Sequence, residues 1–331
     1  MQNTTLFNRI ALITTLLALC VIVLGAYVRL SDAGLGCPDW PGCYGTLTVP
    51  QSSEAIANAQ LAYPNSPVEH PKAWKEMIHR YLATALGLFI LALFAMGWRN
   101  SKQLKVSPWL TTLLVGLVVF QGMLGMWTVT LLLKPVIVSA HLLGGMSTLA
   151  ILTWVTHRHW GASSGNYLTN VRLRWMLRIA IAVLFIQIFL GGWTSTNYAG
   201  LACTDFPTCH GAWLPNMDFF NAFHLVRELG QGADSNPLGL DAYVAIQWIH
   251  RLGALITFLY LGYLGSRLLR QPQLSALSSI MLALLVVQVS LGIANVVLHM
   301  PLVLAVGHNM VAALLLITIV MLNSKITAQH R

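Results

Sequence analysis

Eight apolar segments of about 20 residues run through this chain, and together they leave few folds open to it. A helix of about 20 apolar residues is what crosses the hydrocarbon core of a bilayer. Of the 331 residues, 56% are hydrophobic and only 9% are charged, which excludes a soluble domain whose surface is covered by charges. The sequence therefore predicts an all-α polytopic membrane protein with eight transmembrane helices, at residues 10–30, 76–98, 109–130, 136–157, 175–195, 243–266, 275–298 and 302–323.

The basic residues indicate which side of the membrane each loop faces, because Lys and Arg are retained on the cytoplasmic side. Twelve of the 19 basic residues fall on one side: Arg9, Arg99, Lys102, Lys105, Arg158, Arg172, Arg174, Arg178, Arg267, Arg270, Lys325 and Arg331. The ten acidic residues fall on or near the other side. Both termini are therefore expected in the cytoplasm. The net charge of +9 follows from this topology and gives no reason to expect nucleic acid as a partner.

Two features bear on the compartment. The first span ends in Tyr27-Val28-Arg29, where a cleavable signal peptide would have small residues, so we expect it to remain as a helix. No Arg-rich and Ser-rich transit peptide precedes it. The simplest compartment is a bacterial cytoplasmic membrane.

Motifs of the first half recur in the second half. The run Glu76-Met77-Ile78-His79-Arg80 is matched by the run Gln247-Trp248-Ile249-His250-Arg251. The other matches are Gly25 with Gly191, Gln121 with Gln288, and His141 with His308. Self-similarity over so long a stretch of chain indicates two copies of one unit. Because each half has an even number of spans, we expect two parallel repeats, each a four-helix bundle, at 1–165 and 166–331.

Each half contributes two histidines to apolar helices, His79 and His141 in the first and His250 and His308 in the second. All four are expected at one depth, in the outer half of the membrane. A single membrane histidine is commonly a hydrogen-bonded packing residue, but two repeat-related pairs at one depth indicate a ligand. Two histidines can ligate a haem iron from both sides, and four-helix bundles build such sites from facing helices. Zinc fits less well, since it would require four convergent ligands.

Small and basic residues lie next to these histidines. The small ones are Gly87, Gly122, Gly125, Gly144, Gly145 and Gly253, which permit close backbone approach to a cofactor or simply to another helix. Arg80 and Arg251 directly follow two of the histidines, and a guanidinium can bind a carboxylate with two hydrogen bonds. These arginines are candidates for binding haem propionates or for anchoring the helix at the membrane interface.

Two long outer loops, at 31–75 and 196–242, each contain two cysteines with the same spacing. In an oxidising outer compartment we expect two local disulfides, Cys37–Cys43 and Cys203–Cys209. They are either structural staples or redox-active groups, because a disulfide in a small exposed loop is more easily reduced. The rest of loop 196–242 contains no motif that predicts a role.

The two halves differ at one position where chemistry would be expected. Glu76 lies three residues before His79, on the same helix face, while its counterpart is Gln247. A carboxylate beside one histidine pair and an amide beside the other suggest that one site carries out chemistry and the other holds a resident cofactor. The alternative is structural, because a Glu in the first turn also stabilises a helix N-terminus.

Across almost its whole length the chain resembles the haem A synthase family. The resemblance is carried by the eight spans in two halves, the two five-residue runs that contain His79 and His250, the histidines at 141 and 308, and Gly34-Leu35-Gly36-Cys37-Pro38-Asp39-Trp40-Pro41-Gly42-Cys43. It implies an enzyme that oxidises a methyl group of haem O to the formyl group of haem A by successive hydroxylation.

The resemblance also implies roles for particular residues. His250 and His308 would ligate a resident haem b, His79 and His141 would flank the substrate haem O, and Glu76 would be the catalytic carboxylate. The implied partners are the farnesyltransferase that produces haem O, a haem–copper terminal oxidase or its assembly factors, and an electron acceptor that the sequence does not identify.

Two other functions share most of these features. A diheme b-type electron carrier would have the same histidine pairs, and a haem-delivery protein for a terminal oxidase would have the same loops. The difference between Glu76 and Gln247 distinguishes them from an enzyme, because a pure carrier has little need of it.

Overall fold

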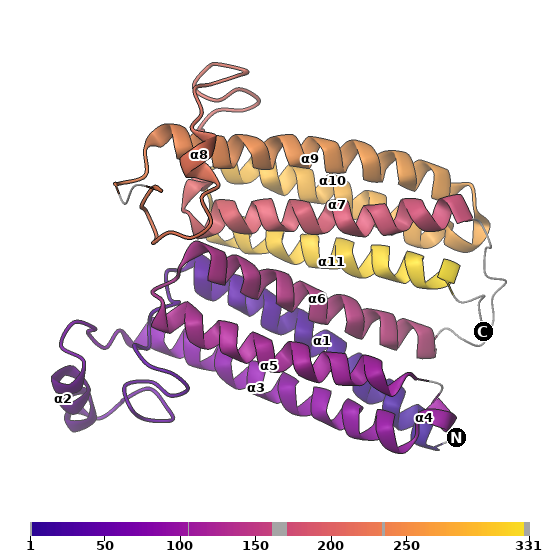
Figure 1. The fold of residues 1–331 in the computed structure, drawn as a ribbon, viewed down its shortest axis with the longest axis horizontal. Helices are drawn as coiled ribbons and strands as arrows, with labels where there is room; N and C mark the ends of the chain where they lie inside the picture. Colours follow the sequence, from indigo (N-terminus) through magenta and orange to yellow (C-terminus); the bar gives the residue numbers. More distant parts are fainter. Residues whose placement is uncertain (1, 105, 161–170, 234–235, 328–331) are drawn as a thin grey trace.

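The structure is a computed structural model that describes residues 2–104, 106–160, 171–233 and 236–327. Its eight long helices are α1 (Gln2–Leu30), α3 (His70–Arg99), α5 (Pro108–Thr130), α6 (Pro135–Trp160), α7 (Val171–Thr196), α9 (Leu240–Leu269), α10 (Pro272–Val297) and α11 (Leu302–Thr327) (Figure 1). Each is long and apolar enough to cross a membrane, so the predicted eight spans are confirmed. The described residues also form four short helices, α2 (Ser53–Ala62), α4 (Ser101–Leu104), η1 (Ala199–Leu201) and α8 (Phe219–Ala222), and no β-strand.

Several helices begin before the predicted spans. α3 starts at His70 rather than at 76, and its first turns contain Lys72 and Lys75, which lower the hydropathy without preventing a helix. Pro71 lies in the first turn of α3, where the missing N–H of proline leaves no helical bond unmade. Hydropathy therefore locates the apolar middle of each helix but not the polar turns at its ends.

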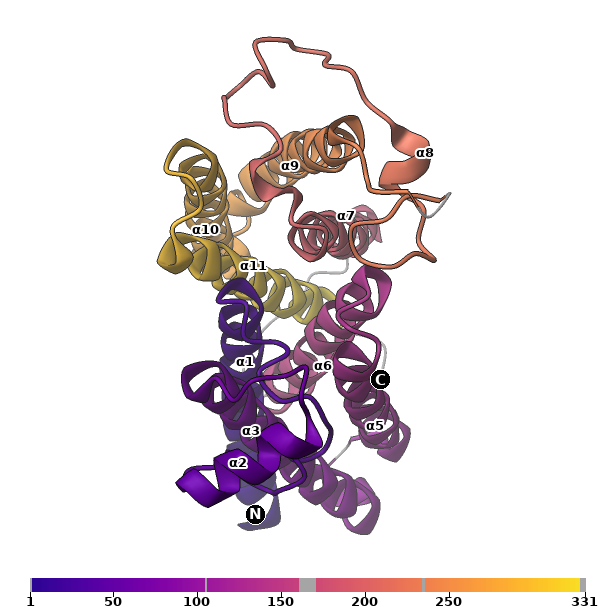
Figure 2. The same cartoon turned by 90° about the vertical axis from the view of Figure 1, so that its left-hand side faces the viewer.

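Contacts between the long helices form two closed rings of four, shown from the side in Figure 1 and from the end that carries α2 and α8, the predicted outer end, in Figure 2. One ring follows the order α1, α3, α5, α6, and the other follows the order α7, α9, α10, α11. In these rings α3 lies diagonally opposite α6, and α9 lies diagonally opposite α11. The two rings contact each other through α11, which packs on α1 and α6, and through α7, which packs on α6. Buried Leu149, Leu177 and Leu316 belong to the one apolar core that the two rings share.

Some contacts between the rings join equivalent positions of the two halves. At the outer end, Nη2 of Arg29 donates to the carbonyl of Ser195 at 2.8 Å, and the two residues are 166 positions apart. At the other end, Oγ of Ser324 bonds to Nδ1 of His157, 167 positions away. These offsets are the ones that relate Gly25 to Gly191 and the matched glutamines to each other.

The outer segments and the chain ends lie at opposite ends of the helices. α2 and α8 lie at one end, whereas the N-terminal end of α1 and the C-terminal end of α11 lie at the other (Figure 1). The predicted boundary between the halves, at residues 165 and 166, lies outside the described residues. So do two of the basic residues assigned to the cytoplasmic side, Lys105 and Arg331.

Candidate functional site

His79 and His250 occupy the same position in the two rings. His79 lies on α3 and faces Gly25 of α1, where an added Cβ would lie 2.9 Å from Cε1 of the imidazole. His250 lies on α9 and faces Gly191 of α7, where the same distance is 3.1 Å. Any larger residue would push the ring away, so each of these histidines is seated by a glycine of the neighbouring helix.

His141 and His308 are seated in the same way, on the diagonally opposite helices α6 and α11. A Cβ at Gly125 of α5 would lie 3.6 Å from Cε1 of His141, and a Cβ at Gly292 of α10 would lie 3.1 Å from Cε1 of His308. Gly292 is absent from the glycines identified by sequence, although it is related to Gly125 by the same offset that relates His308 to His141. Each of the four predicted histidines therefore lies against a glycine of a neighbouring helix, most loosely for His141.

The structure brings the four histidines together in two pairs. His79 and His141 lie close enough to interact electrostatically, and so do His250 and His308. The Nδ1 atoms of His79, His141 and His308 are buried and have no hydrogen-bond partner among the described residues, which is uncommon for buried polar atoms.

This donor set fits a haem. Two imidazoles that interact from diagonally opposite helices can each give one nitrogen to an iron, and the glycines leave room for each imidazole against the neighbouring helix. In the described part of the chain, no three His, Cys, Asp or Glu side chains converge as a zinc site would require.

Glutamines lie beside the histidines of the second ring. Nε2 of Gln187, on α7, lies 3.0 Å from Nδ1 of His250, whereas Nε2 of Gln288, on α10, lies 3.1 Å from Nε2 of His308. Gln187 therefore contacts Nδ1 of its histidine and does not occupy Nε2. Gln288 would have to move before His308 could ligate through Nε2. The sequence reasoning missed Gln187, because it belongs to no matched motif.

The two cysteine loops have the same structure. Disulfides join Cys37 to Cys43 and Cys203 to Cys209, so both predicted pairings are present. In each loop a central carboxylate, Asp39 or Asp205, accepts hydrogen bonds from the two backbone N–H groups that follow the second cysteine. The repeat therefore extends from the helices into the outer loops.

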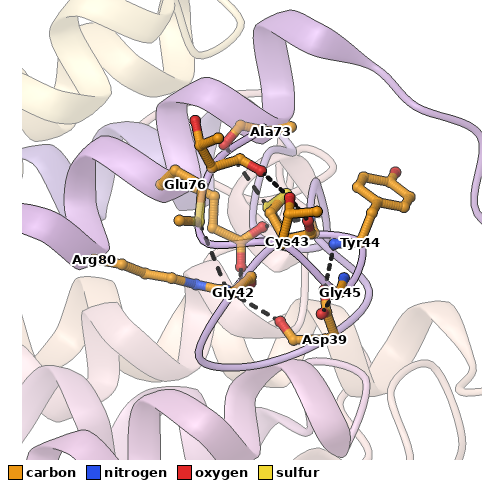
Figure 3. Close-up of a disulfide and its surroundings, with 12 residues drawn as sticks. Asp39, Gly42, Cys43, Tyr44, Gly45, Ala73, Glu76 and Arg80 are labelled. Carbon is orange, nitrogen blue, oxygen red and sulfur yellow. Dashed lines mark hydrogen bonds and ion pairs between the residues drawn. A yellow bond between two sulfur atoms is a disulfide. The ribbon is translucent and has the colours of Figure 1, made fainter. Parts of the chain in front are cut away.

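Glu76 lies against the first disulfide loop, as Figure 3 shows. Its side chain is almost fully buried, and Oε2 accepts a hydrogen bond of 2.9 Å from the backbone N–H of Cys37. Oε1 forms an ion pair of 2.6 Å with Nη2 of Arg80. A buried charge of this kind requires such partners. One carboxylate thus connects the disulfide loop, an arginine and the helix that carries His79.

Gln247 occupies the equivalent place against the second disulfide loop. Its Oε1 accepts a hydrogen bond from the backbone N–H of Cys203, and its Nε2 donates to the carbonyl of Gly200 at 2.7 Å. An uncharged amide therefore satisfies the backbone of this loop. The negative charge of Glu76 is not required to hold a loop of this structure.

Arg80 and Arg251 bind the cysteine loops. Nη1 of Arg80 donates to the carbonyls of Asp39, at 3.0 Å, and Gly42 (Figure 3). Arg251 donates to the carbonyls of Thr208, at 2.8 Å, and Cys203, at 3.0 Å. Both arginines therefore anchor a loop to a helix, and a role in binding haem propionates stays a prediction.

One arginine accounts for much of the loop at 196–242, for which the sequence offered no motif. Arg227 is only 6% exposed. Its guanidinium donates to Oδ1 of Asn197 at 2.6 Å and to the carbonyls of His224 and Gln231 at 3.1 and 2.7 Å. The same group lies 5.8 Å from the ring centre of Trp193, on α7. These contacts hold the described part of the loop against the outer end of α7.

Known proteins are similar to this chain in sequence over almost its full length. Residues 8–320 match the COX15-CtaA family, described as cytochrome oxidase assembly protein. A protein named heme A synthase from Shewanella oneidensis is 45% identical over 326 residues, which make up 98% of this chain and 96% of that protein. Proteins of the same name from Chelativorans sp. and Caulobacter sp. are 31% and 27% identical, over 95% and 92% of this chain and 90% and 92% of their own. The chain belongs to the COX15-CtaA family of cytochrome oxidase assembly proteins.

Proposed function

We propose that this protein oxidises a methyl group of haem O to the formyl group of haem A by successive hydroxylation. The name shared by its relatives supports this reaction. The observation that carries it is the difference between Glu76 and Gln247, which make the same contact to equivalent loops but differ in charge. A protein that only carried electrons would have little use for a buried carboxylate at one haem site and not at the other.

The two rings are parallel repeats, with residues 1–165 acting on the substrate and residues 166–331 holding a resident haem b. The contacts between equivalent residues at both ends of the helices support the repeat, because such contacts form near an approximate two-fold axis. His250 and His308 ligate the resident haem, which supplies one-electron transfer when bound.

In the first ring, His79 and His141 flank the substrate haem O, and Glu76 moves protons or positions a water near the reacting methyl. Glu76 lies one helical turn from His79, and its two oxygens are oriented by the N–H of Cys37 and by Arg80. A positioned carboxylate of this kind is suited to general acid–base catalysis. Conversion of a methyl to a formyl group is an oxidation, so an electron acceptor outside this chain takes up the electrons.

The remaining parts of the proposal concern the cell. The protein lies in the bacterial cytoplasmic membrane, with both termini in the cytoplasm, as the distribution of basic residues predicts. It receives haem O from the farnesyltransferase that produces it. Its product goes to a haem–copper terminal oxidase or to the assembly factors of that oxidase, in agreement with the description of the family.

The test is to express the full chain together with a source of haem O, extract the pigments and determine their masses. We expect haem A, with a singly hydroxylated haem as intermediate. The matched control is the same strain with an empty vector. Haem O that remains unchanged beside a fully haem-loaded protein would instead support the electron carrier or the haem-delivery protein.

A further inference from the structure

The polar contact of His250 with α7 has no counterpart in the first ring. Nε2 of Gln187 lies 3.0 Å from Nδ1 of His250 and donates to the carbonyl of the same residue at 3.1 Å. The equivalent position in the first half is Val21, which precedes Gly25 by the same interval as Gln187 precedes Gly191. There the backbone carbonyl of Val21 is the acceptor for the ring of His79, but the contact falls short of a well-formed hydrogen bond to Nδ1, and none of the described side chains of α1 holds the ring.

A second position differs between the rings together with this one. A Cβ at Gly253, one turn after His250, would collide with Oε1 of Gln187 and would lie 2.8 Å from Cδ1 of Leu190. The glycine therefore provides the space in which the amide sits. Its counterpart in the first half, one turn after His79, is Leu82. One ring combines a large polar residue with a glycine, and the other combines a small apolar residue with a leucine.

The amide of Gln187 can serve a histidine that binds metal through Nε2. In that state Nδ1 carries the proton and needs an acceptor. Oε1 of Gln187 is buried and has no hydrogen-bond partner in the described part of the chain. A half-turn of the amide, which exchanges its oxygen and nitrogen without changing its shape, presents this oxygen to Nδ1 and gives up the hydrogen bond from Nε2 to the carbonyl of His250.

We propose that Gln187 is a positioning residue that fixes His250 for permanent ligation, whereas Val21 leaves His79 unfixed so that the substrate haem can enter and leave. This inference rests on the proposed function, in which the second ring holds the resident haem. A hydrogen bond to the outer nitrogen of a ligating histidine fixes the ring and strengthens its donation to the metal, and its loss typically weakens binding about 10- to 100-fold. The two rings thus differ in how long they retain a haem.

The test compares Gln187→Met, which keeps the size of the side chain but removes the acceptor, with Gln187→Glu, which keeps an acceptor oxygen. Both are made in the full chain with His141→Ala, so that only the second histidine pair can bind a haem from both sides. The rate at which apomyoglobin captures the haem from Gln187→Met should be about 10- to 100-fold higher than the rate for His141→Ala alone. The haem midpoint potential should rise in Gln187→Met and should not rise in Gln187→Glu.

A reciprocal variant tests the same idea without removing a contact. Val21→Gln combined with Leu82→Gly copies the second ring into the first, and it is made with His308→Ala so that only the first pair can hold a haem from both sides. Haem capture from this pair should slow about 10- to 100-fold relative to His308→Ala alone. This variant decides the question if Gln187→Met does not fold.

The failure of the role proposed for Gln187 can be distinguished from the failure of the proposed function. A low-spin signal that survives His250→Ala unchanged would remove the ligand assignment, and the proposed function with it. A signal that requires His250, together with capture rates and a midpoint potential that Gln187→Met leaves unchanged, would overturn the role of Gln187 and leave the proposed function standing. Unchanged capture in the reciprocal variant would likewise overturn it.

Discussion

Oε2 of Glu76 and the backbone N–H of Cys37 form a 2.9 Å hydrogen bond between the helix that carries His79 and the first disulfide loop. In the other half, Oε1 of Gln247 accepts the equivalent bond from the N–H of Cys203. The contact forms with either side chain, so what differs between the halves is the charge. A substitution that exchanges only the charge therefore separates the chemical role of this position from its structural role.

Glu76→Gln should preserve the fold and the haem of the second ring but lose haem A formation. Arg80 loses its counter-charge in this variant, yet Arg251 makes equivalent loop contacts with an amide as its neighbour. If the carboxylate moves protons or positions water, the rate should fall by on the order of a hundredfold or more. Haem O or a singly hydroxylated haem should accumulate, which mass analysis of extracted pigments detects.

Glu69→Gln is the matched control for this experiment, because Glu69 is an exposed carboxylate on the same side whose one ion pair within the described residues is with Lys72. It should leave haem A formation unchanged. Full haem A production by Glu76→Gln at normal protein levels would reduce Glu76 to a residue that holds the disulfide loop, since α3 begins six residues earlier, at His70.

Much of the site could be predicted because the repeat converts single residues into pairs. Hydropathy identified the eight helices, and the near-constant offset between the halves identified the histidines and two of the glycines that seat them, Gly25 and Gly191. A third, Gly125, was noted only as a small residue. A lone membrane histidine has no such support. The same offset leads to Gly292, which sequence reasoning overlooked although it was within reach.

Other features could not be predicted because they depend on contacts that no local pattern records. Arg80 binds the carbonyl of Asp39, far earlier in the chain, and this carbonyl is brought to it only when the disulfide loop has folded. Gln187 differs from Val21 at a position where neither half carries a motif, so its meaning depends on the ring of His250 beside it. Such asymmetries become visible only once the two rings are compared in space.

In the His141→Ala background, where the first pair cannot hold a haem from both sides, His250→Ala should abolish the low-spin b-type spectrum of the purified protein, because we propose that His250 and His308 ligate the resident haem. Optical and electron paramagnetic resonance spectra measure the loss. The control is His70→Ala, since His70 is the first residue of α3 and belongs to neither histidine pair. A full low-spin signal in His250→Ala would contradict the assignment of this ring as the resident site.

The five cysteines should differ in their reaction with an alkylating reagent. Cys20 is free and exposed on the surface of α1, whereas the other four form two disulfides. Detergent-solubilised protein should therefore take up one label before reduction and five after it, as measured by intact mass. In sealed right-side-out vesicles, an impermeant reductant followed by an impermeant label should modify all four loop cysteines. Protection of these four would contradict their outer location.

Arg227→Met should loosen the long outer loop of the second half without changing haem content. The substitution removes buried hydrogen bonds from a charged donor to Asn197 and to two carbonyls, at a cost of about 1.5–3 kcal/mol. Limited proteolysis within 202–233 should accelerate roughly 10- to 150-fold, if the protease cuts the opened loop. Arg270→Met, at an exposed position beyond the end of α9, is the control and should leave the cleavage rate unchanged.

Asp205 should stabilise the second disulfide loop in a way that depends on pH. Hydrogen bonds from the Thr208 hydroxyl and from the backbone N–H groups of Gly211 and His210 hold the pKa of Asp205 below its usual range. A folded pKa that lies below the unfolded one means that the stabilisation is fully present above the unfolded value, about 3.9, and is lost as the pH falls from there. At neutral pH, a phosphine should therefore reduce Cys203–Cys209 faster in Asp205→Asn than in the natural protein, as measured by alkylation and peptide mass analysis.

The ratio of the two reduction rates removes the pH dependence of the phosphine itself. This ratio should stay constant between about pH 8 and pH 5 and should begin to fall toward one below about pH 4, because the carboxylate of the opened loop is then protonated. It should reach one only at a still lower pH, where the carboxylate of the folded loop, whose pKa is lowered, is protonated as well. Reduction of Cys37–Cys43 in the same samples is an internal control, since Asp39 holds that loop and is unchanged. A ratio that is the same at every pH would show that the shape of the side chain, and not its charge, stabilises the loop.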